Sequence, residues 1–173
     1  MTAHPHYFDA MASTPLAPEV RDAMFKILDS KQYAGNASSI THIYGHYARD
    51  VIEQARQEVA GCFNSQPEQW TWTSGATESI NLALQGIART YHRQSKHIIT
   101  FETEHPATLH TCKQLAQQGF TVNVLPVQSN GLIDLNQLEE ALKTPTLLIS
   151  ILHVNNEIGV IQPLDAVCEL AQR

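Results

Sequence analysis

The sequence contains only three cysteines, and it has no long apolar run. Cys62, Cys112 and Cys168 are an odd number and lie far apart, so a disulfide framework is not expected and a reducing compartment is favoured. No uninterrupted apolar stretch approaches the roughly 20 residues of a membrane span, and the first residues lack the charged and then apolar pattern of a signal peptide. We therefore expect a cytoplasmic protein with no membrane segment.

Positive charge is also sparse. The 11 Lys and Arg residues are outnumbered by 17 Asp and Glu residues, which gives a net charge of −6. No basic block is present to follow the phosphates of DNA or RNA, so nucleic-acid binding is not expected. With 173 residues, of which 43% are hydrophobic, the chain is instead typical of a globular protein with a real core.

Segments typical of strands alternate with segments typical of helices, which predicts a mostly parallel α/β sheet flanked by helices. The predicted strands are residues 70–73, 97–101, 121–125 and 146–154. The last of these is almost continuously apolar, as in a strand buried on both faces. The final helix begins near Pro163 and is expected to be still running at Arg173, so the sheet is predicted to be incomplete, with its next strand missing.

The segment from Thr73 to Ser79 (Thr-Ser-Gly-Ala-Thr-Glu-Ser) joins a predicted strand to a predicted helix. Gly75 allows a tight turn there, and the first N–H groups of the helix have no partner inside it. Because these amides converge and the helix dipole favours negative charge, the turn is a candidate phosphate site. The pattern also fits a helix capped by Ser or Thr without any ligand, because such caps are common.

Three polar residues are expected at the same edge of the sheet. His105 follows the strand at residues 97–101, and Asn155 and Asn156 follow the strand at residues 146–154. Open α/β folds bind ligands at the carboxyl ends of their strands. An imidazole there can stack on an aromatic ligand or move a proton near neutral pH. Alternatively, His105 is a capping or surface residue and the two asparagines form a turn.

A metal site is an alternative interpretation of two of the histidines. His42 and His46 have the i, i+4 spacing of one helix face. No cysteine or third histidine is close in sequence to complete a tetrahedral set, so no metal is predicted.

Together these motifs resemble those of cysteine desulfurases of the NifS/IscS type, in the class-V aminotransferase group of fold-type-I pyridoxal-phosphate (PLP) enzymes. The resemblance covers nearly the whole chain and is strongest at residues 73–79, 103–105, 130–134 and 153–159. It implies that residues 1–173 are an N-terminal segment plus the first half of the PLP-binding large domain of that fold, with the C-terminal half absent.

The resemblance also implies a cofactor, PLP, and a role for each matching residue. The implied cofactor-binding residues are Gly75, Ala76, Thr77, His105 and Asn156. The backbone and side chains of residues 76–77 would hold the phosphate, and His105, the one candidate catalytic residue, would stack on the pyridine ring and help to move protons. Asn156 would hydrogen-bond the phenolic oxygen of the ring, and Asn155 would help to place the substrate carboxylate.

The sequence differs from the family in the residues that carry out the reaction. The lysine that binds the cofactor covalently, the acidic partner of the ring nitrogen, the substrate-binding arginine and the sulfur-accepting cysteine all lie further along the chain in the family. None of the five lysines here stands in the family's motif. The cysteines are predicted to pack as small apolar residues, since Cys112 and Cys168 fall on apolar helix faces and Cys62 lies near a helix end.

Two functions are consistent with these features. The first is the N-terminal part of a cysteine desulfurase, which converts L-cysteine to L-alanine and transfers the sulfur to an enzyme cysteine for iron–sulfur cluster or thio-cofactor assembly. The resemblance then implies a homodimer and a sulfur-acceptor or scaffold protein, and this chain is expected to be inactive alone. The alternative is a non-catalytic short paralogue that binds a phosphorylated ligand or a protein partner.

Overall fold

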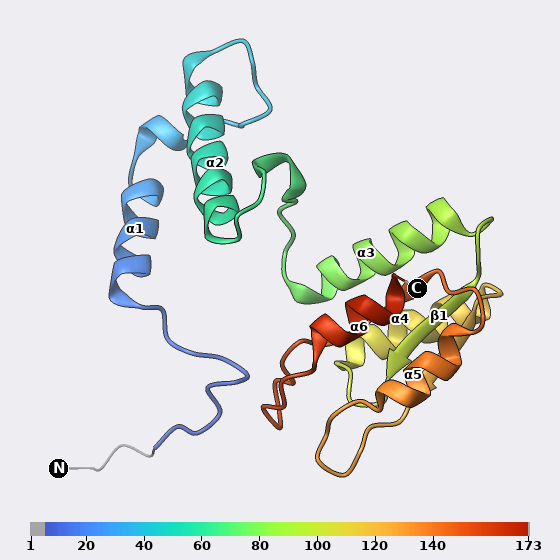
Figure 1. Ribbon diagram of the computed structural model, residues 1–173. Helices are drawn as coiled ribbons and strands as arrows, with labels where there is room; N and C mark the ends of the chain where they lie inside the picture. Colours follow the sequence, from blue (N-terminus) through green and yellow to red (C-terminus); the bar gives the residue numbers. More distant parts are fainter. Residues whose placement is uncertain (1–5, 173) are drawn as a thin grey trace. The chain divides into compact units, whose positions relative to one another are not determined.

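The computed structural model describes residues 6–172, which fold as two compact units (Figure 1). The first unit covers residues 1–72 and is built from helices, whereas the second covers residues 73–173 and contains both helices and strands. All of the predicted site residues belong to the second unit.

The first unit contains two main helices and two short 3-10 helices, in the order α1 (Pro18–Leu28), η1 (Lys31–Tyr33), α2 (Ile43–Cys62) and η2 (Pro67–Gln69). Pro18 occupies the first turn of α1, as predicted, because the N–H that proline lacks has no helical partner there. Gly45 lies so close to the preceding loop that a Cβ would be 2.1 Å from the Ser39 carbonyl oxygen. None of the residues of α1 is buried, so this unit has little core of its own.

The prediction of a strand at residues 70–73 is wrong. The chain is extended at Trp70, but it pairs with no strand in the described range. Its polar groups bond to α2 and to the loop after it instead: the Trp70 indole N–H donates to Ser65 Oγ at 2.7 Å, and the Trp70 carbonyl accepts from Arg56 at 2.5 Å. Local side-chain bonds therefore replace the expected sheet pairing.

The second unit is organised by a three-stranded parallel sheet with the order β2-β1-β3. Two of its strands, β1 (His97–Phe101) and β2 (Thr121–Leu125), have the predicted bounds. The third, β3 (Leu148–Ile149), is far shorter than the predicted 146–154 and is only half-buried. The strand buried on both faces is β1, because side chains of helices pack against Ile98 on one face and against Ile99 on the other.

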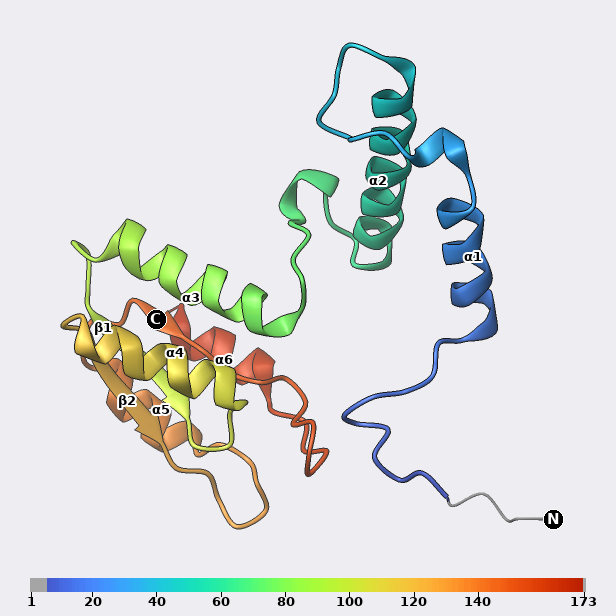
Figure 2. The same cartoon turned by 180° about the vertical axis from the view of Figure 1, so that it is seen from behind.

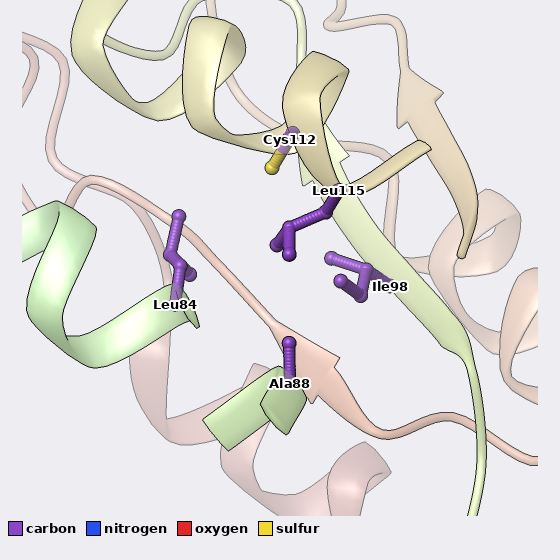
Figure 3. Close-up of a cluster of buried hydrophobic side chains, with 5 residues drawn as sticks. All are labelled: Leu84, Ala88, Ile98, Cys112 and Leu115. Carbon is purple, nitrogen blue, oxygen red and sulfur yellow. The ribbon is translucent and has the colours of Figure 1, made fainter. Parts of the chain in front are cut away.

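Helices cover both faces of this sheet, as predicted. Against one face pack α3 (Ala76–Tyr91) and α4 (Pro106–Gln117), and against the other pack α5 (Leu135–Leu142) and α6 (Leu164–Ala171). Successive side chains of a strand point to opposite faces, so Ile98 joins the first core cluster and Ile99 the second. Figure 3 shows the first cluster, formed by Leu84, Ala88, Ile98, Cys112 and Leu115.

The helix ends mostly follow the sequence signals. The Asp134 carboxylate caps α5 by accepting from the N–H groups of Asn136 and Gln137 at 2.9 and 3.3 Å. The last helix, α6, ends at Ala171 and does not continue as predicted, while Arg173 lies outside the described residues. No helix in the range 6–172 is long and apolar enough to cross a membrane.

The predicted packing of the cysteines is confirmed only for Cys112, which is 1% exposed. Cys168 is exposed, because the buried stripe of α6 runs through Val167 with Leu164 and Leu170 half-buried at i ± 3. Cys62, in the last turn of α2, is exposed as well. Burial raises the pKa of the Cys112 thiol, and the nearby Glu104 carboxylate adds to the effect, so Cys112 is a poor nucleophile.

Candidate functional site

A pocket of about 320 Å³ opens where the chain leaves β1 and β3. It is lined by residues from the turn after β1 and from the loop after β3: Glu102, Thr103, Glu104, His105, Pro106, Asn155, Asn156, Glu157 and Ile158. The sequence predicts that His105, Asn155 and Asn156 meet at one edge of the sheet, and the structure brings all three into this pocket.

His105 is the N-cap of α4. Its Nδ1 accepts a hydrogen bond from the Ala107 N–H at 3.1 Å, and Pro106 follows in the first turn. An imidazole nitrogen that accepts a bond carries no proton, so the neutral ring holds its hydrogen on Nε2. The side chain is exposed, and its Nε2–H and ring face remain available to a ligand. The capping role and the ligand role are therefore compatible in one residue.

Asn155 and Asn156 differ in what their amides do. The Asn155 side chain is 8% exposed, donates to the Thr103 carbonyl at 2.9 Å and accepts from the N–H groups of Glu157 and Ile158 at 2.9 and 3.0 Å. The Asn156 side chain is exposed and forms no hydrogen bond with any residue in the described range. Asn156 is thus free to bind a ligand, whereas a substrate-binding role for Asn155 stays a prediction for an amide that is already largely engaged.

Glu104 is the residue of this pocket that the sequence analysis missed. It is 8% exposed, and its Oε1 accepts from the Leu152 N–H at 2.5 Å. Burial raises the pKa of this carboxyl group, against the opposite effect of its hydrogen bonds with Leu152 and Thr108. The only sequence signal is an acid directly before His105, which is equally typical of an exposed turn.

The start of α3 is the candidate phosphate site. Gly75 has φ +154° and ψ −177°, a conformation essentially restricted to glycine. Residues 74–77 are exposed, and the N–H groups of residues 75–77 donate to no acceptor in the described part of the chain. The Glu78 carboxylate accepts from both the N–H and the Oγ of Ser74 at 2.6 Å, and these bonds lower its pKa. Glu78 thus stabilises the turn, and the N–H groups of residues 75–77 stay without an acceptor in the described part of the chain.

Gly75, Ala76 and Thr77 do not line the pocket that holds His105 and Asn156. They lie at the same end of the unit, however: α3 and α4 pack along each other, and both begin at the end where β1 finishes (Figures 1 and 2). The pocket itself is acidic, with three carboxylates from Glu102, Glu104 and Glu157. A phosphate is therefore more favoured at the start of α3 than among these carboxylates.

No group of three or more His, Cys, Asp and Glu side chains in residues 6–172 is arranged to hold a metal ion. Of the two histidines with helical spacing, His42 serves as the N-cap of α2, since its Nδ1 accepts from the Gly45 N–H at 3.1 Å. None of the lysines lines the pocket between the turn after β1 and the loop after β3.

Comparison with known proteins identifies relatives along nearly the whole chain. A sequence model described as "Aminotransferase class-V" matches residues 6–173. The cysteine desulfurase IscS of Vesicomyosocius okutanii is 46% identical over 169 residues, which is 98% of this chain and 42% of the relative. The cysteine desulfurase IscS of Photorhabdus laumondii is 47% identical over 168 residues, which is 97% of this chain and again 42% of the relative.

Solved structures share the fold. A NifS-like protein superimposes with a TM-score of 0.88 at 37% identity, covering 94% of this chain and 44% of that structure. SspA, solved in complex with cysteine, gives a TM-score of 0.88 at 38% identity, covering 96% of this chain and 47% of its own. The chain spans less than half the length of these relatives, and its fold matches the N-terminal part of fold-type-I PLP enzymes. By the match over residues 6–173, the chain belongs to the class-V aminotransferase family.

Proposed function

We propose that this chain supplies the cofactor cradle of a PLP-dependent cysteine desulfurase, the enzyme that removes sulfur from L-cysteine and leaves L-alanine. The IscS relatives, 46–47% identical over 97–98% of the chain, support this assignment. The pocket supports it further, because the exposed His105 and Asn156 both line it. The helix that follows His105, α4, begins at the same end of the unit as α3 (Figure 2).

The residues present fit PLP in three respects. The open N–H groups of residues 75–77 suit a phosphate, because the start of a helix favours an anion and presents unpaired donors to it. The His105 ring is exposed beside the pocket and can stack on a flat heterocycle. The unpaired Asn156 amide can donate to a phenolic oxygen.

When bound, PLP would act as the electron sink for chemistry on the substrate. The residues of this chain would orient it: the backbone at Ala76 and Thr77 and the Thr77 hydroxyl would hold the phosphate, and Asn156 would fix the direction of the ring. His105 would cover one ring face and, with its hydrogen on Nε2, would move a proton at that atom. Asn155 remains a candidate for placing the substrate carboxylate.

The cradle lacks a lysine of its own. The lysines of the chain are Lys26, Lys31, Lys96, Lys113 and Lys143, and none lines the pocket. We therefore expect reversible cofactor binding by residues 1–173 without a specific covalent bond, and no desulfurase activity by this chain alone. The further parts of the proposal are a cytoplasmic homodimer with a sulfur-acceptor or scaffold protein as its partner.

Pyridoxine 5′-phosphate tests the cofactor site directly, because it carries an alcohol where PLP has its aldehyde. It therefore cannot form a covalent imine with any lysine. We expect the 173-residue chain to bind it reversibly and to bind pyridoxine, which lacks the phosphate, much more weakly in calorimetry or ³¹P NMR. Thr77→Val should weaken binding about fivefold through loss of one hydrogen bond, and His105→Ala about two- to tenfold through loss of stacking.

Two matched variants control for general effects on the helices. Thr90→Val alters an exposed threonine near the other end of α3, and His110→Ala alters an exposed histidine on α4. Both should leave the affinity unchanged. Equal binding of pyridoxine and its phosphate would contradict the cradle, and sulfide release from L-cysteine by this chain with PLP would contradict its inactivity. Equally tight binding of unrelated phosphorylated compounds would favour the non-catalytic alternative.

A further inference from the structure

We propose that Glu104 and Asn155 are positioning residues that cross-link the turn after β1 to the loop after β3 and so hold His105 and Asn156 in place. This inference rests on the proposed function only in treating His105 and Asn156 as the ligand-binding groups. The loop concerned, residues 152–162, is called the 152–162 hairpin, because Val154 and Ile161 form an antiparallel bridge within it.

The two cross-links run in opposite directions. Glu104, in the turn after β1, accepts from the backbone of the hairpin at Leu152, with 2.5 Å between Oε1 and N. Asn155, in the hairpin, donates to the backbone of the turn at Thr103, with 2.9 Å between Nδ2 and O. Each segment thus contributes one side chain and one backbone group. Two bonds at separate points prevent the rotation that a single bond would allow.

Each cross-linking residue directly precedes the residue that it positions. Glu104 is followed by His105, which also caps α4, and Asn155 is followed by Asn156. Both cross-linking side chains are 8% exposed, whereas His105 and Asn156 are exposed. The arrangement places the bracing groups inside and the ligand-binding groups outside.

The hairpin is also fixed internally, so a constraint at its base reaches its tip. Asn155 accepts from the N–H groups of Glu157 and Ile158, and its own N–H donates to the Val160 carbonyl at 2.9 Å. On the second strand of the hairpin, also at its base, the buried Gln162 amide donates to the Gly131 carbonyl at 2.9 Å and accepts from the Ile133 N–H at 3.0 Å. These bonds fix both strands of the hairpin at its base and the turn between them.

Amide hydrogen exchange on the 173-residue chain tests the Glu104 cross-link. Glu104→Ala should speed exchange of the Asn155 and Gln162 amides about 10- to 100-fold, the effect of losing a bond to a charged group. Neither amide is bonded to Glu104; they donate to the Val160 and His153 carbonyls. Glu104→Gln keeps an acceptor oxygen for the Leu152 N–H and should restore most of the protection.

Glu102→Ala is the matched control for this measurement. Glu102 is also a glutamate that lines the pocket, but its Oε1 accepts from the Val127 N–H at 3.0 Å, in the segment that follows β2, and not from a group of the hairpin. Its removal should leave exchange in the hairpin unchanged. The cross-link is refuted if Glu104→Ala and Glu102→Ala have the same effect on the Asn155 and Gln162 amides.

Asn155→Asp isolates the second cross-link. It keeps the oxygen that accepts from Glu157 and Ile158 but replaces the donor to the Thr103 carbonyl. Protection of those two amides should persist, while the His105 ring signals shift in NMR and the affinity for pyridoxine 5′-phosphate falls about tenfold. Unchanged ring signals and unchanged affinity would overturn the proposal.

These readouts separate the two proposals. If the unaltered chain does not bind pyridoxine 5′-phosphate, the proposed function fails, and the exchange and ring signals still decide whether Glu104 and Asn155 brace the site. If Glu104→Ala does not fold, Glu104→Gln and Asn155→Asp provide the comparison: the bracing role requires the second, which cuts a cross-link, to disturb His105 more than the first.

Discussion

Two glycines of the α3 region should respond to the same substitution with opposite signs. Neither Gly75 nor Gly86 has any atom within 4 Å of the place that a Cβ would occupy, so alanine meets no steric obstacle at either position. They differ in backbone conformation: Gly75 has φ +154° and ψ −177°, while Gly86 lies in the interior of α3. Any difference between the two variants therefore reports backbone preference.

The conformation of Gly75 costs about 1–3 kcal/mol for a residue with a side chain, so Gly75→Ala should lower the free energy of unfolding by that amount. In the helix interior, alanine is more favourable than glycine by about 0.5–1 kcal/mol, so Gly86→Ala should be stabilising. For a unit of about 100 residues, 1 kcal/mol shifts Tm by about 4–8 °C. The two variants should thus differ by well over 5 °C.

Urea unfolding followed by circular dichroism measures the two free energies, and amide exchange in β1 assigns the change to the second unit, where all five residues of that strand are buried. The reasoning is refuted if Gly75→Ala is as stable as the unaltered chain or if both variants shift in the same direction. A relaxed turn in Gly75→Ala should also bind pyridoxine 5′-phosphate more weakly, because the open amides at the start of α3 would point elsewhere.

Three further predictions concern the same unit. Asp134→Ala should cost about 1 kcal/mol in urea unfolding, because the N–H groups of Asn136 and Gln137 lose their cap, and Asp134→Asn should cost less. Leu138→Ala, at a side chain that is 0% exposed, should cost about 2–5 kcal/mol, whereas Leu82→Ala, at one that is 54% exposed, should stay within about 0.5 kcal/mol. Burial lowers the pKa of His97 below 6.5, so the folded state resists protonation. The contribution of His97 to the free energy of unfolding should therefore be full above pH 6.5 and fall as the pH drops below it. In unfolding curves measured at several pH values, His97→Gln should abolish this pH dependence.

The sequence determines β1 and β2 well because their signals are local. Residues 97–101 and 121–125 are short β-branched or apolar segments between turn residues, and the structure places both strands at these bounds. The predictions fail where hydrogen bonds to other segments of the chain determine the local structure. Residues 70–73 have strand-forming side chains, but the polar groups of Trp70 bond to Ser65 and Arg56. High β-propensity is only a weak predictor when a local partner competes.

The predicted strand at residues 146–154 fails for a related reason. Its apolar composition is typical of a buried strand, yet the last bond to β1 is the one from the Ser150 N–H to the Ile99 carbonyl. The N–H of Leu152 then bonds to the Glu104 carboxylate, so the side chain of another segment takes the place of a neighbouring strand. The acid that ends this strand lies 48 residues away in sequence, and no periodicity within residues 146–154 reports it.

The same limit separates the predictable part of the site from the rest. His105, Asn155 and Asn156 could be placed at one edge because parallel strands present their carboxyl ends together. Which of them keeps a side chain without an internal partner could not be predicted, because that depends on bonds such as the one from Asn155 to the Thr103 carbonyl. The burial of Glu104 could likewise not be predicted, since an acidic residue in a turn is exposed in most proteins.

Structural and ligand-binding roles are often weighed as alternatives for one residue, but the geometry of this site is compatible with both. His105 caps α4 through Nδ1, and that bond is what directs its Nε2–H and ring face outward. Gly75 permits the turn, and the turn is what leaves the next amides without partners. A capping bond at the edge of a sheet is thus no argument against a ligand. The backbone amide that bonds to the capping side chain also fixes the direction in which the rest of that side chain points. Stability and ligand binding must therefore be measured together on every variant of these residues.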